Sequence, residues 1–227
     1  GMKEALLMSV TFQDIQNSVE IRTYITQADA SLIALGFTEH SFAHVGRCAD
    51  VAARILNELG YPAREVELAR IAAFMHDIGN VVNRHDHAIS GATMAFRILD
   101  KMGMEPAEVA TVITAIGHHD DSTAFPVNAV AAALILADKT DVRRSRVRNN
   151  DVINFDIHDR VNYAVERSEV LLDTVSGTVT LSLTINTQVC AVMDYFEIFL
   201  ERMLLCRRAA EFLGLTFKLD INGLGLL

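Results

Sequence analysis

The sequence predicts a mainly α-helical protein, a helical bundle with a small C-terminal α+β extension. Up to about residue 140, apolar residues recur at spacings of three and four between glycine and proline stops, as in helices packed on a core. After about residue 150, Thr178–Ile185 and Leu215–Ile221 alternate polar and apolar residues, as half-buried strands do. We therefore expect an N-terminal helical segment over 1–37, a helical core over 38–149 and an α+β unit over 150–227.

Composition limits the class of protein. The chain has 227 residues, 51% of them hydrophobic, which is enough to bury a substantial core. Its net charge of −9 argues against a nucleic-acid polymer as partner, because neutralising phosphates requires a basic surface. Three cysteines without metal-binding spacing indicate free buried thiols. No uncharged apolar run approaches the roughly 18 residues of a membrane span, so we expect a cytoplasmic protein without a membrane partner.

The first 60 residues predict helices on both sides of a glycine stop. Residues 9–36 read as one interrupted helix or two short ones. Thr38 is a suitable N-cap for a long helix that runs to Leu59 and is stopped by Gly60. His44 lies on the flank of the apolar stripe of this helix.

The next predicted helix, at about 64–77, is apolar on nearly every side and should be buried. It delivers His76 and Asp77 side by side, and residues 79–86 form a polar connection to a helix that begins at His87. Burying an imidazole and a carboxylate is costly unless each is paired or bound to a cation. The common partner that satisfies both groups is a metal ion.

Two further core helices each carry a metal-capable side chain. In the helix that begins at Pro106, His119 extends the apolar row, whereas His118 points about 100° away from it. Pro126 should open the last core helix, in which Asp138 occupies a core-facing position.

Past residue 150 the expected elements are short. They are a helix within Ile157–Arg167, strands at Val170–Asp173, Thr178–Ile185 and Leu215–Ile221, and a long helix over about 188–213. We expect this unit to shape the substrate pocket or to mediate self-association as a homodimer.

The order and spacing of these residues resemble the HD superfamily of metal-dependent phosphohydrolases. His44 is followed by the name-giving doublet in Phe74-Met-His-Asp-Ile-Gly79 and by an aspartate in Leu136-Ala-Asp138. His87-Ala-Ile-Ser-Gly-Ala92 and Ala115-Ile-Gly-His-His119 resemble the further histidine elements of the two-metal branch. That branch includes HD-GYP phosphodiesterases and symmetrical dinucleoside-tetraphosphate hydrolases. The GYP signature is absent and Asn80 replaces a lysine of those enzymes, so a cyclic-dinucleotide activity is not expected.

The resemblance implies an HD-domain helical bundle that holds two divalent transition-metal ions. The implied ligands are His44, His76, Asp77, His87, His118, His119 and Asp138, with the choice between the two adjacent histidines open. Such a shell suits iron, manganese, cobalt, nickel or zinc and is too rich in nitrogen to favour magnesium. Asp77 would bridge the ions, which activate a water that attacks phosphorus, and Asn80 would assist catalysis.

A basic cluster after Asp138 indicates a small phosphorylated, nucleotide-like substrate. The candidate contacts with it are Arg84, Lys139, Arg143 and Arg144. Two alternatives stay open. The first is a di-iron oxygenase, because some HD-superfamily members use the same six ligands with an iron pair to oxidise an organic substrate. The second alternative is a regulatory or sensing module with a structural metal, although the complete ligand set argues against it.

Overall fold

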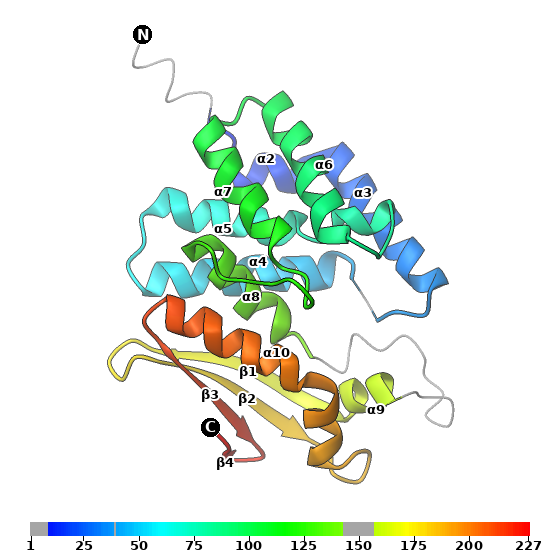
Figure 1. Ribbon diagram of the computed structural model, residues 1–227, viewed down its shortest axis with the longest axis vertical. Coiled ribbons are helices and arrows are strands. Elements are labelled where there is room, and N and C mark those ends of the chain that lie inside the picture. The colour runs from blue at the N-terminus through cyan, green and yellow to red at the C-terminus, as the bar shows by residue number, and fades with distance from the viewer. Residues whose placement is uncertain (1–8, 39, 143–156) are drawn as a thin grey trace.

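The computed structural model describes residues 9–38, 40–142 and 157–227. A helical bundle lies above a small sheet that helix α10 covers on one face (Figure 1). The bundle consists of α2 (Phe12–Asn17), α3 (Val19–Ala34), α4 (Phe42–Glu58), α5 (Ala63–Met75), the 3-10 helix η1 (Ile78–Val81), α6 (His87–Lys101), α7 (Pro106–Gly117) and α8 (Ala129–Lys139). The extension consists of α9 (Ile157–Ala164), β1 (Val165–Asp173), β2 (Thr178–Ile185), α10 (Val192–Phe212), β3 (Thr216–Ile221) and β4 (Leu224–Gly225). The predicted fold class is confirmed, whereas the boundaries of its three parts stay a prediction.

The predicted starts of two helices are wrong because each helix begins after a polar residue that lies nearer to its apolar stripe. Helix α4 begins after Ser41, three residues later than expected from Thr38. Helix α8 begins after Asn128, whose side chain accepts a hydrogen bond from the backbone N–H of Ala131, and not at Pro126. The N-terminal residues form two helices, with Ser18 capping the second.

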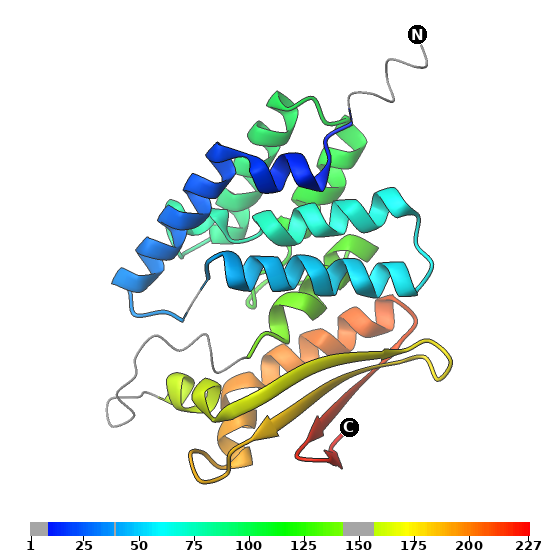
Figure 2. The same ribbon diagram turned by 180° about the vertical axis from the view of Figure 1, so that it is seen from behind.

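The polar connection expected over 79–86 begins as a buried turn instead. Residues Ile78–Val81 form η1, in which Ile78, Gly79 and Asn80 are all buried. Figure 2 shows the bundle from behind, with α4 and α5 running side by side. Because η1 packs on α3 and α6, the chain that follows His76 and Asp77 lies inside the bundle.

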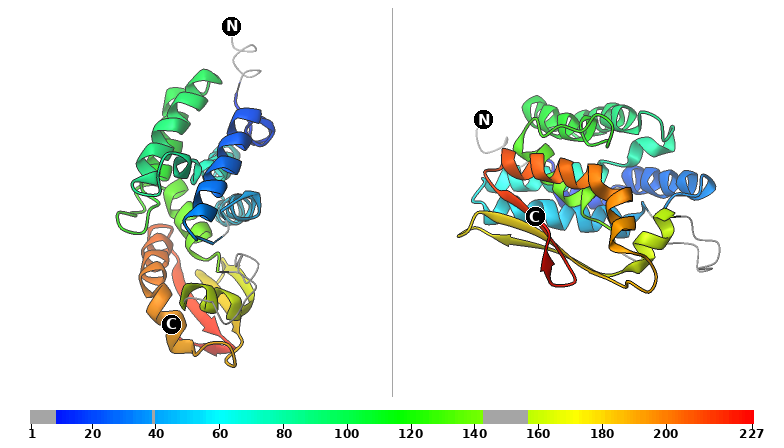
Figure 3. Two further views of the ribbon diagram at one scale, coloured as in Figure 1. Left: turned by 90° about the vertical axis from the view of Figure 1, so that its right-hand side faces the viewer. Right: turned by 60° about the horizontal axis from the view of Figure 1, so that its bottom comes forward.

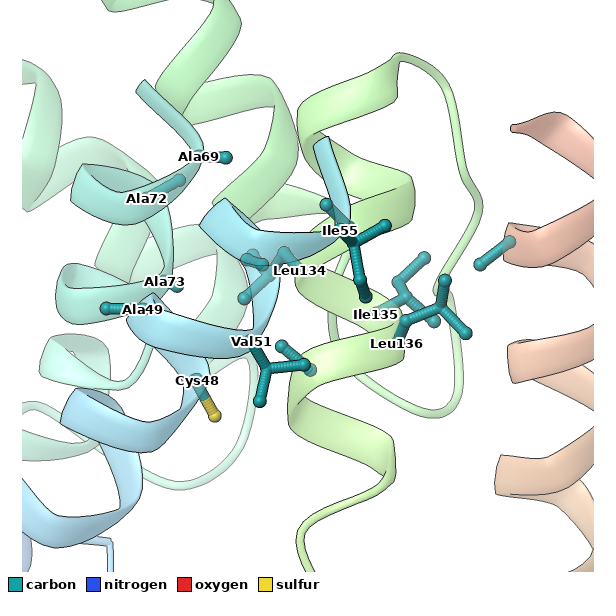
Figure 4. Packing of buried hydrophobic residues seen from close by; sticks show 14 of the residues in the cluster. Cys48, Ala49, Val51, Ile55, Ala69, Ala72, Ala73, Leu134, Ile135 and Leu136 are labelled. Carbon is teal, nitrogen blue, oxygen red and sulfur yellow. The ribbon is translucent and has the colours of Figure 1, made fainter. Parts of the chain in front are cut away.

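The core is centred on α8, in which every residue from Ala129 to Ala137 is buried. Helices α4, α5, α7 and α10 pack around it. Figure 4 shows alanines of α5 beside Ile55 of α4 and Leu134 of α8. Small side chains on α5 allow the neighbouring helices to approach closely.

The sheet has the strand order β1-β2-β3-β4. Strands β1 and β2 form an antiparallel hairpin, whereas β2 and β3 are parallel, with Thr178 opposite Thr216. Parallel neighbours need a crossover connection, which α10 supplies. Figure 3 shows α10 beside the sheet, and α10 contacts both β3 and α8, so this helix joins the sheet to the bundle.

Two sequence expectations concern cysteines and membranes. Cys48, Cys190 and Cys206 are buried free thiols, as predicted. Within the described part of the chain, no helix is both long and apolar enough to span a bilayer.

Arg64 joins three parts of the bundle, and we expect its replacement by alanine to lower the free energy of unfolding by about 1–3 kcal/mol. Its guanidinium donates to both carboxylate oxygens of Glu108 (2.6 and 2.9 Å), to Glu67 (2.7 Å) and to the backbone oxygen of Val10 (2.7 Å). Urea unfolding monitored by circular dichroism measures the change. Arg207→Ala is the control, because Arg207 is exposed on α10. If Arg207→Ala lowered the free energy of unfolding as much as Arg64→Ala, the hydrogen bonds of Arg64 would not be the cause of the loss.

Candidate metal centre

Six metal-capable side chains converge where helices of the bundle begin or end. His44 comes from the first turn of α4, His87 is the first residue of α6, and Asp138 lies in the last turn of α8. His76 and Asp77 join α5 to η1, and His119 follows α7. Five of the six are at most 6% exposed, and Asp138 is partly buried.

The first half of the centre contains four ligand atoms. The Nε2 atom of His44 lies 3.0 Å from Oδ1 of Asp138 and 3.5 Å from Oδ2 of Asp77. The Nε2 atom of His76 lies 3.3 Å from each of the same two oxygens. Ligands bound to one ion at about 2.0–2.2 Å stand about 3.0–3.5 Å from one another. These four atoms therefore have the spacing of one coordination shell.

The second half faces the other oxygen of Asp77. Nε2 of His87 lies 3.8 Å and Nε2 of His119 lies 3.7 Å from Oδ1 of Asp77. The two imidazole nitrogens are 3.1 Å apart. Because the two oxygens of Asp77 face different histidine pairs, this carboxylate is placed to bridge two ions.

The tautomers of the four histidines follow from their Nδ1 partners. The acceptors are the backbone oxygen of Ala73 for His76 (2.6 Å), of Arg84 for His87 (2.9 Å) and of Ile116 for His119 (2.6 Å), and a carboxylate oxygen of Asp141 for His44 (2.7 Å). A carbonyl or carboxylate oxygen accepts only, so each Nδ1 carries the proton. With the proton on Nδ1, it is the Nε2 atom of each imidazole that faces the carboxylates and that would bind a metal ion. Four Nε2 atoms that face two carboxylates are an arrangement suited to a metal cation among them.

The electrostatics of the centre support this conclusion. Nε2 of His76 and Oδ2 of Asp77 are buried and receive no hydrogen bond within the described residues. Burial raises the pKa of Asp77, but the nearby imidazoles, His76 foremost, outweigh it and hold the carboxyl pKa well below its usual range. Burial, followed by repulsion from His119, lowers the pKa of His87 to about 4. An ionised carboxylate beside a neutral imidazole is the state that binds metal.

Three of the predicted site residues are not seen in the centre. His118 donates its Nδ1 proton to the backbone oxygen of Thr114 (2.8 Å) and lines a surface pocket beside Phe96. The structure therefore brings His119, and not His118, to the other ligands, which is the choice that helical phase favours. Arg143 and Arg144 lie outside the described residues.

The other two predicted cations lie close to the centre. Nζ of Lys139 is 2.7 Å from Oδ2 of Asp138 and 2.5 Å from Asp121. Arg84 donates to the side-chain oxygen of Asn80 (3.2 Å). Both cations border the narrow cleft that contains Asp77.

Sequence reasoning missed several residues around these ligands. Asp121 pairs with both Lys139 and Arg202 of α10, so the extension contributes a cation to the cleft. No local pattern joins residues this far apart in the chain. The Cys48 thiol packs 3.8 Å from the His44 ring, and burial raises its pKa, so it is neutral.

Asp141 is the missed residue with the clearest role, since it fixes the tautomer and orientation of His44. It is fully buried and lies just past the end of α8, three residues after Asp138, a nearness in the sequence that could have indicated it. We expect Asp141→Ala to weaken metal binding by about 10–100-fold, because outer carboxylates orient histidine ligands. Competition with a fluorescent chelator measures the affinity. Binding within twofold of wild type would refute this role.

The comparison with protein families agrees with the geometry. The family model described as HD domain matches residues 41–197, and the chain belongs to this family. No curated protein and no solved structure gives a significant match. The HD superfamily generally consists of metal-dependent hydrolases. Two groups in the centre could hold a metal ion, namely His44, Cys48, His76 and Asp138, and His76, Asp77 and His119.

Proposed function

We propose that this protein is a metal-dependent phosphohydrolase of the two-metal branch, which hydrolyses a small phosphate ester or anhydride. The observation that carries the proposal is the convergence of four imidazole Nε2 atoms on the two oxygens of Asp77. Polar side chains of the described residues line the cleft beside Asp77, and family membership makes hydrolysis the first chemistry to test.

The ligand set divides into two groups that share Asp77. His44, His76 and Asp138 would hold one ion, and His87 with His119 would hold the other. The donors suit iron, manganese, cobalt, nickel or zinc. When bound, such ions lower the pKa of water and neutralise charge on phosphoryl oxygens.

Asn80 acts in this proposal as a positioning residue. Its side-chain N–H donates to the backbone oxygen of Asp77 (2.9 Å), and its oxygen accepts from Arg84 (3.2 Å). The buried side-chain amide of Asn80 thus stabilises the turn that carries Asp77, and it orients the guanidinium of Arg84 at the cleft. A direct catalytic role of Asn80 stays a prediction.

Cations in the cleft have two roles. Lys139 is buried, and its ammonium holds Oδ2 of Asp138, which leaves Oδ1 facing His44 and His76. Arg84 and Arg202 border the cleft and are placed to bind phosphate oxygens. In this proposal Lys139 supports Asp138, and its predicted contact with substrate stays a prediction.

The same ligands would serve a di-iron oxygenase, so the test must separate the two reactions. Protein purified without chelators and loaded with Mn²⁺ or Fe²⁺ is assayed for phosphate release from a panel of phosphate esters and for oxygen consumption. We expect phosphate release that depends on the metal and no oxygen consumption. Oxygen uptake with an oxidised product, without phosphate release, would overturn the proposal.

A further inference from the structure

Cys48 (Figure 4) lies on α4, one helical turn after His44. Its side chain is fully buried, and Sγ lies 3.8 Å from each of the two ring nitrogens of His44. Residues four apart on a helix lie on the same face, so the thiol and the imidazole share one side of α4. The thiol therefore lies beside Nε2 of His44, the nitrogen that faces Asp77 and Asp138.

Three other ligand atoms lie close to this sulfur. One metal-binding atom from each of His44, Cys48, His76 and Asp138 belongs to a group whose members all lie within 4.8 Å of one another. A sulfur and a nitrogen bound to one ion at about 2.3 and 2.0–2.1 Å stand roughly 3.5–3.8 Å apart. The 3.8 Å between Sγ of Cys48 and Nε2 of His44 fits this separation.

A second observation indicates that an ion belongs among these atoms. Nε2 of His76 is buried and receives no hydrogen bond within the described residues, and His76 is a member of the same group as Cys48. A buried thiol is otherwise a small apolar side chain of the core. Cys190 and Cys206 fit that description, since neither belongs to a group of candidate ligands in the described part of the chain. Cys48 differs from them by its position beside three ligand atoms.

We propose that Cys48 is a further ligand of the ion held by His44, His76 and Asp138, and that its thiolate makes this position selective for zinc. As the sulfur–metal bond forms, the S–H bond breaks and its proton leaves to the solvent, because the thiolate is the form that binds metal. Thiolate is a soft donor that favours zinc, whereas manganese prefers oxygen donors. This role of Cys48 rests on the metal centre of the proposed function, whichever reaction the centre catalyses.

The sulfur makes the two halves of the centre unequal. The first half gains a ligand, whereas the described residues of the second half are His87, His119 and the shared Asp77. A site with three protein ligands keeps positions open for water, and a site with a full shell does not. His87 and His119 also border the cleft, whereas Cys48 and His76 are not among the described residues that line it. The open positions therefore belong to the second half.

Cobalt reports a bound sulfur directly, because thiolate bound to Co²⁺ gives a strong charge-transfer absorption in the near ultraviolet that histidine and carboxylate ligands do not give. Metal-free protein is titrated with Co²⁺, and absorption and bound cobalt are measured in wild type, Cys48→Ser and the control Cys206→Ser, which changes another fully buried thiol. We expect the band in wild type and in the control, and its loss in Cys48→Ser with cobalt still bound.

The outcomes separate failure of the sulfur ligand from failure of the proposed function. Wild-type protein that binds Co²⁺ without the band, or a band that persists in Cys48→Ser, overturns the role of Cys48 and leaves the hydrolase intact. The band without any phosphate release supports the role of Cys48 and contradicts the hydrolase. Wild-type protein that binds no Co²⁺ overturns both.

Competition with a chelator then tests the selectivity for zinc. A ligand should contribute at least as much as an outer hydrogen-bond partner, so we expect Cys48→Ser to lower the Zn²⁺ affinity about tenfold or more and the Mn²⁺ affinity much less. Equal losses for the two ions overturn the selectivity. Melting temperatures show whether each variant is folded, and Cys48→Ala replaces Cys48→Ser if the serine variant is not.

Discussion

Replacing Asp77 with asparagine is expected to remove most of the bound metal and to lower kcat/KM for phosphate esters by about a thousandfold or more. Each oxygen of Asp77 faces a different pair of histidines, so this one carboxylate serves both halves of the centre. An amide keeps the shape of the side chain but loses its charge and one acceptor oxygen. The substitution therefore lowers the metal affinity of both ion positions, which substitution of no other single ligand should do.

Elemental analysis and phosphate release measure the two effects of Asp77→Asn. Asp50→Asn is the matched control, because Asp50 is exposed on α4, the helix that carries His44. The control should retain wild-type metal content and activity. Wild-type metal content in Asp77→Asn would show that this residue is not a bridging ligand.

Gly79→Ala is expected to lower the free energy of unfolding by about 3 kcal/mol and to weaken metal binding. A Cβ at this position would lie 2.0 Å from the backbone oxygen of His87, 2.5 Å from the backbone N of Gly91 and 2.7 Å from Oγ of Ser90. Two of these atoms belong to the backbone of α6 and cannot rotate away. The added methyl must separate η1 from α6, which moves Asp77 away from His87.

The matched control for this prediction is Gly46→Ala. Gly46 lies inside α4 and has no atom within 4 Å of an added Cβ. Alanine there should stabilise the protein by about 0.5–1 kcal/mol, since glycine is unfavourable within a helix. Urea unfolding and metal content measure both variants. A Gly79→Ala variant as stable as wild type would mean that η1 and α6 can separate without cost.

Much of the helical bundle could be predicted because its signals are local. Helix α6 begins at His87 and α7 has Pro106 in its first turn, as the sequence indicates. The candidate ligands were identified by order and spacing, since family resemblance supplies the long-range information that periodicity lacks. Helical phase alone favoured His119 over His118, because one residue turns a side chain by about 100°.

The features of the fold and of the site that the sequence did not predict depend on contacts between distant parts of the chain. The pairing of Asp121 with Lys139 and Arg202 joins a loop, α8 and α10, and no sequence period encodes it. Helix α4 begins after Ser41, which makes no side-chain capping hydrogen bond, so a local capping signal could not have located this start. The turn at Ile78–Val81 looked like a polar connection because burial of Asn80 is visible only in the fold.

We propose above all that the six metal-capable side chains of the centre hold two divalent ions, which share the carboxylate of Asp77. The most direct test of this proposal is the binding stoichiometry of metal-free protein titrated with Mn²⁺, read by electron paramagnetic resonance and elemental analysis. We predict two ions per chain in wild type, one in His119→Ala and none bound tightly in Asp77→Asn. Failure of the wild-type protein to bind Mn²⁺, Fe²⁺ or Zn²⁺, or binding that all these substitutions leave unchanged, would contradict it.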